Sequence, residues 1–174
     1  MKKITFSLAT LVFFFSCNAK NEQATISESS GNKVEIAFTK EGELTFFNEE
    51  NEEIKKIDIE IAETPNERAR GLMDRSQMDE NKGMLFIFED DNIRKHTFYM
   101  KDTRIPLDIM YFSPDSVLIN IARNAQPGAD SEMSQGGSVE AAKEDSKFVV
   151  EINGGLADKW GLKEGVTKIH WNRN

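Results

Sequence analysis

The chain has very little cysteine and histidine, and this limits the chemistry that it can carry. Cys17 is the only cysteine among 174 residues, so the sequence after it offers neither a disulfide nor a thiol nucleophile. The two histidines, His96 and His170, lie far apart and form no H-x-x-x-H or H-x-H pattern. A catalytic zinc normally takes three protein ligands, often including histidine. We therefore expect no metal site and no cofactor.

Motifs for nucleotide binding and for serine hydrolysis are missing as well. The sequence contains no G-x-S-x-G, no Walker loop and no G-x-G-x-x-G. The pair Gly154 and Gly155 has neither the spacing nor the long following helix of a dinucleotide site. No set of nucleophile, base and metal ligands can be assembled from the residues that remain.

Basic side chains are in the minority. The chain has 22 lysines and arginines against 30 aspartates and glutamates, a formal net charge of −8. Without residues 1–16, which hold two lysines, 20 basic and 30 acidic side chains remain and the formal charge is −10. Phosphate backbones and anionic lipid headgroups repel such a body. We expect no nucleic-acid partner, and any membrane attachment must have another origin.

The one long apolar run lies at the N-terminus and is shorter than a membrane span. Lys2 and Lys3 precede apolar residues 4–15, which is typical of a secretory signal peptide. Cys17 follows the small Ser16, and this resembles the lipobox of bacterial lipoproteins, in which cleavage precedes a lipid-modified cysteine. The alternative is ordinary secretion with cleavage after Ala19.

We therefore expect residues 1–16 to be a lipoprotein signal peptide and Cys17 to be the lipidation site. Residues 17–32 are rich in serine, asparagine and glutamate and lack apolar periodicity, so they are predicted to form a flexible tether. Residues 33–174 have the length of one domain. The expected location is the cell envelope, lipid-anchored in the outer membrane or facing the periplasm, with the membrane contacted through the lipid.

Alternating apolar residues predict a mainly β domain. The apolar run at 83–89 predicts a strand covered on both faces in the centre of a sheet. The remaining expected strands lie at residues 34–38, 44–46, 57–61, 96–100, 105–112, 117–122, 147–152 and 167–171. Few helices are expected beside these strands. The fold class that this predicts is an antiparallel sandwich or a small, jelly-roll-like barrel with two short helices.

Both short helices have recognisable ends. Thr64 is the expected N-cap of the first, with Pro65 at its first position, Glu67 placed to close a capping box, and Gly71 near its end. The segment LADKW is expected to make a single helical turn ended by Gly161. The connection at 123–146 is long for a compact domain, and such loops tend to be functional or mobile.

Four blocks of the sequence resemble one family. In chain order they are ERARGLMDR, GMLF, FYMKDTRIPLD and KFVVEINGG. Together they are similar to the DUF192 family, a prokaryotic family of unknown function, over about residues 57–169. Tyr99 stands at the family's tryptophan position and Asp102 at its asparagine position. The resemblance implies a mainly β, jelly-roll or barrel-like fold and leaves the activity open.

Asp108 is the first candidate site residue. It shares a strand face with Met110 and Phe112, and a carboxylate taken out of water needs a cation or several N–H donors. Arg68, Arg70 or Lys101 could supply the cation. An internal structural pair and a ligand-facing or acid–base role both remain open, and we favour the structural role.

Glu151 lies in an apolar strand between Val150 and Ile152. It could pair with Asp108 as two carboxylates whose pKa values are split, the arrangement used in general acid–base hydrolysis. A solvent-facing glutamate, or one bound to an arginine, is the alternative. The sequence sets no distance between the two carboxylates.

Charged residues in a loop and on the first helix complete the candidates. Residues 101–104, KDTR, join two expected strands, where they form either an ordinary turn or a recognition loop. Arg70 has a planar fork suited to carboxylate or phosphate, or simply lies on a solvated helix. The candidate ligand-binding residues are Arg70, Lys101, Asp102, Thr103, Asp108 and Glu151.

The favoured function is an envelope-tethered, non-catalytic module that binds an unknown envelope ligand or protein. The alternative is a hydrolase-like or lyase-like enzyme that uses Asp108 and Glu151 with an arginine.

Overall fold

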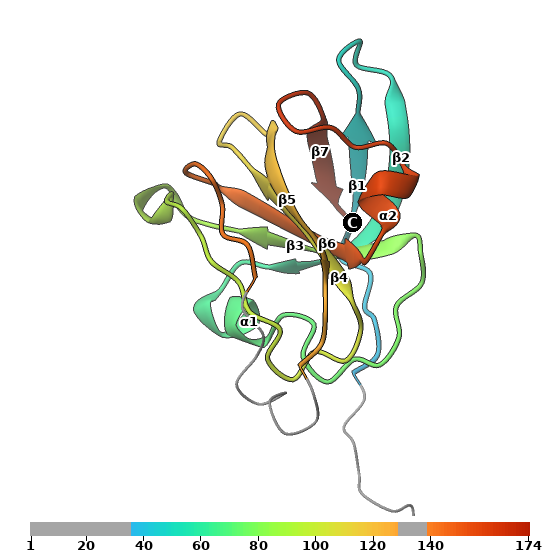
Figure 1. Cartoon of the computed structure of the whole chain (residues 1–174), viewed down its shortest axis with the longest axis vertical. Coiled ribbons are helices and arrows are strands. Elements are labelled where there is room, and N and C mark those ends of the chain that lie inside the picture. The colour runs from blue at the N-terminus through green and yellow to red at the C-terminus, as the bar shows by residue number, and fades with distance from the viewer. Residues whose placement is uncertain (1–35, 129–138) are drawn as a thin grey trace, which may run out of the picture. The chain divides into compact units, whose positions relative to one another are not determined.

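Within residues 36–128 and 139–174, which a computed structural model describes, seven strands form a single sheet (Figure 1). Their order across the sheet is β5-β4-β6-β3-β2-β1-β7. Neighbouring strands are antiparallel except for β2 and β3, which are parallel, so the sheet is mixed. The strands are β1 (Gly42–Phe47), β2 (Glu53–Ala62), β3 (Lys82–Ile87), β4 (Leu107–Phe112), β5 (Leu118–Ala125), β6 (Phe148–Asn153) and β7 (Lys168–Arg173).

The sheet curls until its two edges meet at one end. An isolated bridge joins Val117, just before β5, to Lys168 of β7. The backbone N–H of Leu118 donates to the carbonyl of Thr167 at 2.8 Å. Along the rest of their lengths the edge strands are not ladder partners, so the sheet is not closed into a barrel. The mainly β class is confirmed.

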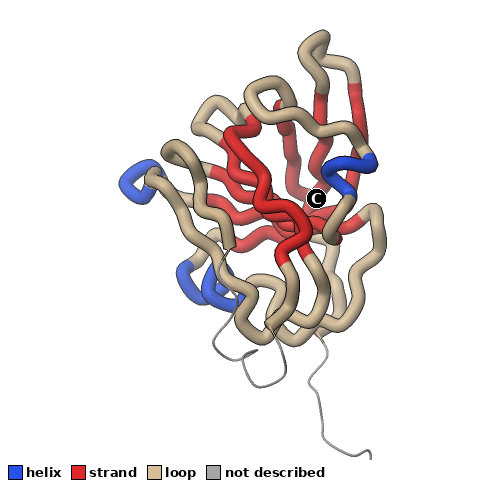
Figure 2. Tube along the Cα trace, viewed as in Figure 1, coloured by secondary structure: helices blue, strands red, loops and turns tan. Residues whose placement is uncertain are grey.

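Helices occupy only short segments of the described chain (Figure 2). They are α1 (Pro65–Arg70), the 3₁₀-helix η1 (Asp90–Asn92) and α2 (Leu156–Lys159). The predicted capping box of α1 is confirmed, because Thr64 N donates to Glu67 Oε2 at 2.8 Å and Glu67 N donates to Thr64 Oγ1 at 3.3 Å. Gly71 ends this helix with a φ of 45°.

Both faces of the sheet are buried. One core cluster includes Phe46, Leu85 and Val150, with Leu156 of α2 packed among them. The other lies on the opposite face and includes Ile109 and Val149. Strand β3 lies at the centre of the order and is buried on both faces, as its continuous apolar run predicts.

Two expected strands are wrong. Residues 36–38 form no strand, and residues 34–35 lie outside the described chain. Residues 96–100 are extended, but they cross over a face of the sheet instead of joining it: His96 and Met100 are buried, while Tyr99 is 51% exposed. The alternation that predicted a strand arises because an extended segment packs one side on the core.

We call residues 94–103 the covering segment. It is attached by an isolated bridge between Arg94 and Ser146 and by a hydrogen bond from Ala142 N to the carbonyl of His96 at 2.9 Å. The expected signal peptide, Cys17, the tether and the centre of the 123–146 connection lie outside the described residues.

Asp108 connects three elements of the fold. Its side chain is 1% exposed and accepts two backbone hydrogen bonds of 2.8 Å, from Asn124 N of β5 and from Ala157 N of α2. The N–H donors that a buried carboxylate requires are therefore supplied by the backbone, and no arginine or lysine is needed. Asp108 fixes α2 and β5 to β4.

We expect Asp108→Ala to lower the free energy of unfolding by on the order of 2 to 4 kcal/mol, because two buried N–H groups lose their acceptor. Denaturant titration measures the change. Asp115→Ala is the matched control, since Asp115 is exposed in the turn before β5. A loss no larger than that of the control would contradict the structural role.

Candidate functional site

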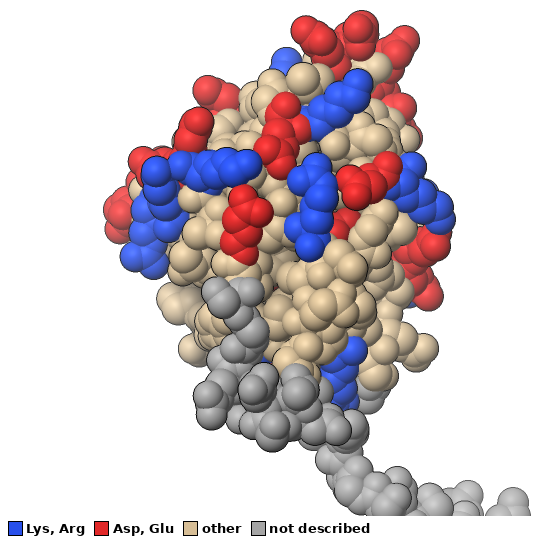
Figure 3. All heavy atoms as spheres, viewed as in Figure 1, with Lys and Arg blue, Asp and Glu red and all other residues tan. Residues whose placement is uncertain are grey.

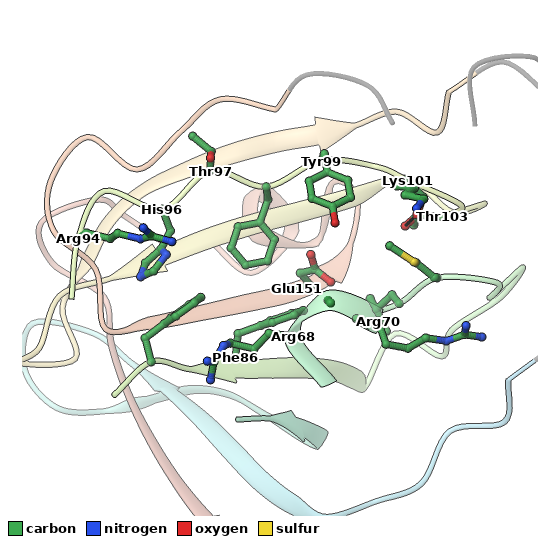
Figure 4. Close-up of a pocket in the computed structure, with 16 residues that line it drawn as sticks. Arg68, Arg70, Phe86, Arg94, His96, Thr97, Tyr99, Lys101, Thr103 and Glu151 are labelled. Atoms are coloured by element: carbon green, nitrogen blue, oxygen red, sulfur yellow. Dashed lines mark hydrogen bonds between the residues drawn. The ribbon is translucent and has the colours of Figure 1, made fainter. Parts of the chain in front are cut away.

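A cavity of about 220 Å³ lies between the covering segment, the end of α1 and one face of the sheet (Figure 4). It exceeds the cavity volume of about 150 Å³ that suffices for benzene. Its walls come from α1 and the turn after it, from the end of β3, from the covering segment and from β6. The lining residues are Arg68, Ala69, Arg70, Gly71, Leu72, Met73, Phe86, Phe88, Arg94, His96, Thr97, Phe98, Tyr99, Lys101, Thr103 and Glu151.

Glu151 provides the acidic group of this cavity. Ile109 pairs with it across β4 and β6, and strand alternation puts both side chains on the face that carries Val149. Glu151 is 5% exposed, and no described residue hydrogen bonds to its carboxyl group or forms an ion pair with it. Burial raises its pKa to about 8. At pH 7 the side chain is therefore mainly a neutral acid that faces the cavity.

Aromatic side chains line the same cavity as the acid. Phe86 and Phe98 pack edge to face with ring centroids 5.0 Å apart. The ring of His96 stacks on that of Phe88 with centroids 3.5 Å apart, and the His96 Nε2 is buried without a hydrogen-bond partner among the described residues. Burial, and next the charge of Arg94, lower the pKa of His96, so this imidazole is neutral at pH 7. The interior is consequently apolar with few polar groups, as is usual for small-molecule sites.

Four basic residues line the outer part of the cavity. Arg68 donates to the carbonyl of Ile87 at 3.0 Å, and Arg70 pairs with Asp74 at 2.9 Å. The other two, Arg94 and Lys101, form no ion pair with a described residue. Among the described residues that line the cavity, only Glu151 is acidic. In an acidic chain, this mouth is therefore locally positive and suited to anions.

Four of the six candidate residues meet at this cavity. Arg70, Lys101, Thr103 and Glu151 line it, and Figure 4 shows Glu151 between α1 and the covering segment. Asp102 does not line it. Its φ of 51° and the hydrogen bond from Asp74 N to its carbonyl at 2.8 Å identify it as a turn residue.

Asp108 and Glu151 lie on opposite faces of the sheet. Asp108 pairs across the strands with Ile152, and its neighbour Ile109 pairs with Glu151, so the two carboxyl groups point away from each other. The hypothesis that joins them as a pair of catalytic carboxylates is therefore wrong.

Sequence reasoning missed His96, Arg94, Phe88 and Tyr99 as cavity residues. Three of them belong to the covering segment, in which the alternation at residues 96–100 predicts a strand. One signal was available, since Tyr99 occupies the position where the resembled family has tryptophan. No signal in the sequence places Phe88 beside His96.

Gly71 is required where α1 meets the cavity. Its φ of 45° is a backbone conformation that residues with a side chain rarely adopt. An added Cβ would lie 3.2 Å from the ring of Phe86. Any larger residue would strain the backbone and press on the cavity wall.

The family model of DUF192, described as an uncharacterized ACR, matches residues 46–170. The chain belongs to the DUF192 family. All four blocks that indicated DUF192 supply lining residues: Arg68 from the first, Phe86 from the second, Lys101 from the third and Glu151 from the fourth. The cavity is thus where these separated DUF192 segments meet.

Two solved structures are similar to this DUF192 chain. One is a protein of unknown function from Novosphingobium aromaticivorans DSM 12444, with 32% identity, a TM-score of 0.63, and coverage of 74% of this chain and 84% of that one. The other, from Sinorhizobium meliloti 1021, is called a "putative transcription regulator". It has 27% identity, a TM-score of 0.65, and coverage of 79% and 98%. No curated protein matches the chain.

The described part of the chain brings together no group of three or more histidine, cysteine, aspartate or glutamate side chains that could hold a metal ion. None of its helices is long and apolar enough to cross a membrane.

We expect Glu151→Gln to remove a pH dependence from the stability. The folded-state pKa of about 8 exceeds the ordinary 4.5, so between these values the folded chain holds a proton that the unfolded chain releases. The free energy of unfolding of the wild type should therefore fall as the pH rises from 4.5 to 8, by on the order of 3 kcal/mol at pH 7.

Denaturant titrations between pH 4.5 and pH 9 measure this effect as the difference between the variant and the wild type. The variant should gain on the wild type as the pH rises. Glu144→Gln, at an exposed position outside the cavity lining, is the control and should change nothing. A constant difference across this range would show that Glu151 is ionised in the folded chain.

Proposed function

We propose that this chain is a non-catalytic module that binds a small organic ligand in the cavity beside Glu151, and that a lipid on Cys17 holds it at the cell envelope. The observation that carries the binding proposal is the Glu151 carboxyl group, buried without a described partner and facing the cavity. A buried polar group costs free energy unless it is hydrogen bonded. A ligand that reaches Glu151 would supply the missing partner.

Binding is favoured over catalysis by what surrounds the acid. Acid–base hydrolysis by two carboxylates needs the second one on the same side of the sheet, and Asp108 lies on the other. The nearby imidazole of His96 is stacked on Phe88. Neither group is arranged as the partner of Glu151 in a proton transfer.

We propose no nucleic-acid partner for this chain. The Sinorhizobium structure is called a "putative transcription regulator", but this chain has a formal charge of −8. On the face that Figure 3 shows, acidic and basic side chains are interspersed. A DNA-binding surface would instead gather basic side chains that neutralise several phosphates.

The envelope location rests on the N-terminal sequence. Two lysines, an apolar run and Cys17 after Ser16 resemble a lipoprotein signal. Because the remaining chain is acidic, its charge would not hold it on an anionic membrane. A covalent lipid would provide the attachment.

We expect benzoate, benzamide or benzylamine to raise the melting temperature of the full-length chain, because a mono-aromatic molecule fits the volume of the cavity. Thermal-shift measurements give the effect. Ala69→Trp, at an exposed lining position of α1, should abolish it by filling the mouth. Asn66→Trp lies on the same helix outside this lining and is the control. Equal shifts in the wild type and the Ala69→Trp variant, or no shift with any of the three, would refute binding in the cavity.

We expect Cys17→Ala to move the protein from the membrane to the soluble fraction, because the lipid acceptor is lost. Fractionation of expressing cells followed by immunoblotting measures the distribution. Thr25→Ala, in the expected tether, should stay with the membrane. Membrane retention of Cys17→Ala would refute lipid anchoring and leave the cavity proposal untouched.

A further inference from the structure

Two parts of the cavity restrict the ligand to a narrow chemical class. The floor is formed by Glu151, and the mouth is formed by Arg68, Arg70, Arg94 and Lys101. Resting on the proposed function, we infer that the cavity takes a planar aromatic anion that carries an uncharged amide-type group, namely a carboxamide, lactam or imide. The amide edge pairs with Glu151 at the floor, and the anionic group lies among the basic residues at the mouth.

The floor selects the amide edge. Glu151 is enclosed by apolar groups and has no cationic partner among the described residues, which favours its neutral form. A neutral carboxyl group presents one O–H donor beside one carbonyl acceptor. An amide edge presents an N–H beside a carbonyl, so the two groups complete a pair of parallel hydrogen bonds. A ligand that lacked either the N–H or the carbonyl would leave one polar group of the buried Glu151 carboxyl without a hydrogen bond.

The walls select a flat ring. Phe86 and Phe98 both line the cavity and meet edge to face, with ring centroids 5.0 Å apart. The walls therefore offer ring faces and edges, which suits an aromatic body.

The mouth selects the anion. Arg94 is exposed and Lys101 half-buried, and neither forms an ion pair with a described residue. Arg68 donates to the backbone carbonyls of Glu63 and Ile87. A cationic ligand would pass these charges unfavourably and would then have to ionise Glu151, whereas an anionic group gains from them.

The test is isothermal titration of the full-length chain at pH 6.5 with matched probes. The 3- and 4-carbamoylbenzoates carry both groups, benzoate and benzamide carry one each, and 4-(aminomethyl)benzoate replaces the amide by a cation. We expect at least one carbamoylbenzoate to bind about tenfold or more tightly than benzoate, benzamide and the amine.

Substitutions of Glu151 test whether the acid binds the ligand in its neutral or its ionised form. Glu151→Gln keeps a donor beside an acceptor, so it should bind the carbamoylbenzoate within about threefold of the wild type, while Glu151→Leu should lose about tenfold or more. Wild-type affinity should fall as the pH rises through 8, because the ionised acid cannot donate, and that of Glu151→Gln should stay constant. Glu144→Gln is the control and should follow the wild type.

Substitutions at the mouth test the anionic end. Arg94→Gln and Lys101→Gln should weaken the carbamoylbenzoate severalfold and leave benzamide unchanged. Lys95→Gln, next to Arg94 and outside the cavity lining, should alter neither.

Two outcomes would overturn the inference while the proposed function stands. One is tighter binding of 4-(aminomethyl)benzoate that strengthens with rising pH and disappears in Glu151→Gln, which would mean that an ionised acid pairs with a cation. The other is binding of benzoate or benzamide, blocked by Ala69→Trp, with no gain from joining the two groups. Absence of binding by every probe overturns both proposals.

Discussion

Burial of the central strands on both faces is the constraint that decides the chemistry of this protein. Strands β4 and β6 lie side by side, and each carries one carboxyl group among mostly apolar residues. Asp108 meets two backbone N–H donors, whereas Glu151 meets a cavity. Two similar residues at similar depth therefore differ in role, because their partners differ: one stabilises the fold, and the other is available to a ligand.

The cavity exists because an extended segment lies across the sheet without joining it. The covering segment is attached at Arg94 and His96 by backbone contacts to residues 146 and 142, and its aromatic side chains pack on Phe86 and Phe88. A strand added to the edge of the sheet would have used the same alternating residues and left no such space. The positive mouth has a similar origin, since α1 and the covering segment bring together basic residues that are separated in the sequence.

The segments that place the chain in the DUF192 family are also the segments that form the cavity. The matching region, residues 46–170, includes all the lining residues, and the four blocks by which the sequence resembles the family meet around Glu151. Two solved structures, with TM-scores of 0.63 and 0.65, share this fold. A ligand for this cavity would explain physically why those blocks occur together.

The elements whose causes are local could be predicted from the amino-acid sequence alone. Alternation predicted most strands, the capping box at Thr64 and Glu67 predicted α1, and the unbroken apolar run predicted a central β3. The sequence also indicated Arg70, Lys101, Thr103 and Glu151, but it paired Glu151 with Asp108 and assigned the covering segment to the sheet. Both predictions failed because strand register and the path of an extended segment depend on contacts between residues that are distant in the sequence. Apolar periodicity indicates which side chains are buried. The neighbours that the fold places beside a buried carboxyl group determine whether it stabilises the fold or faces a cavity.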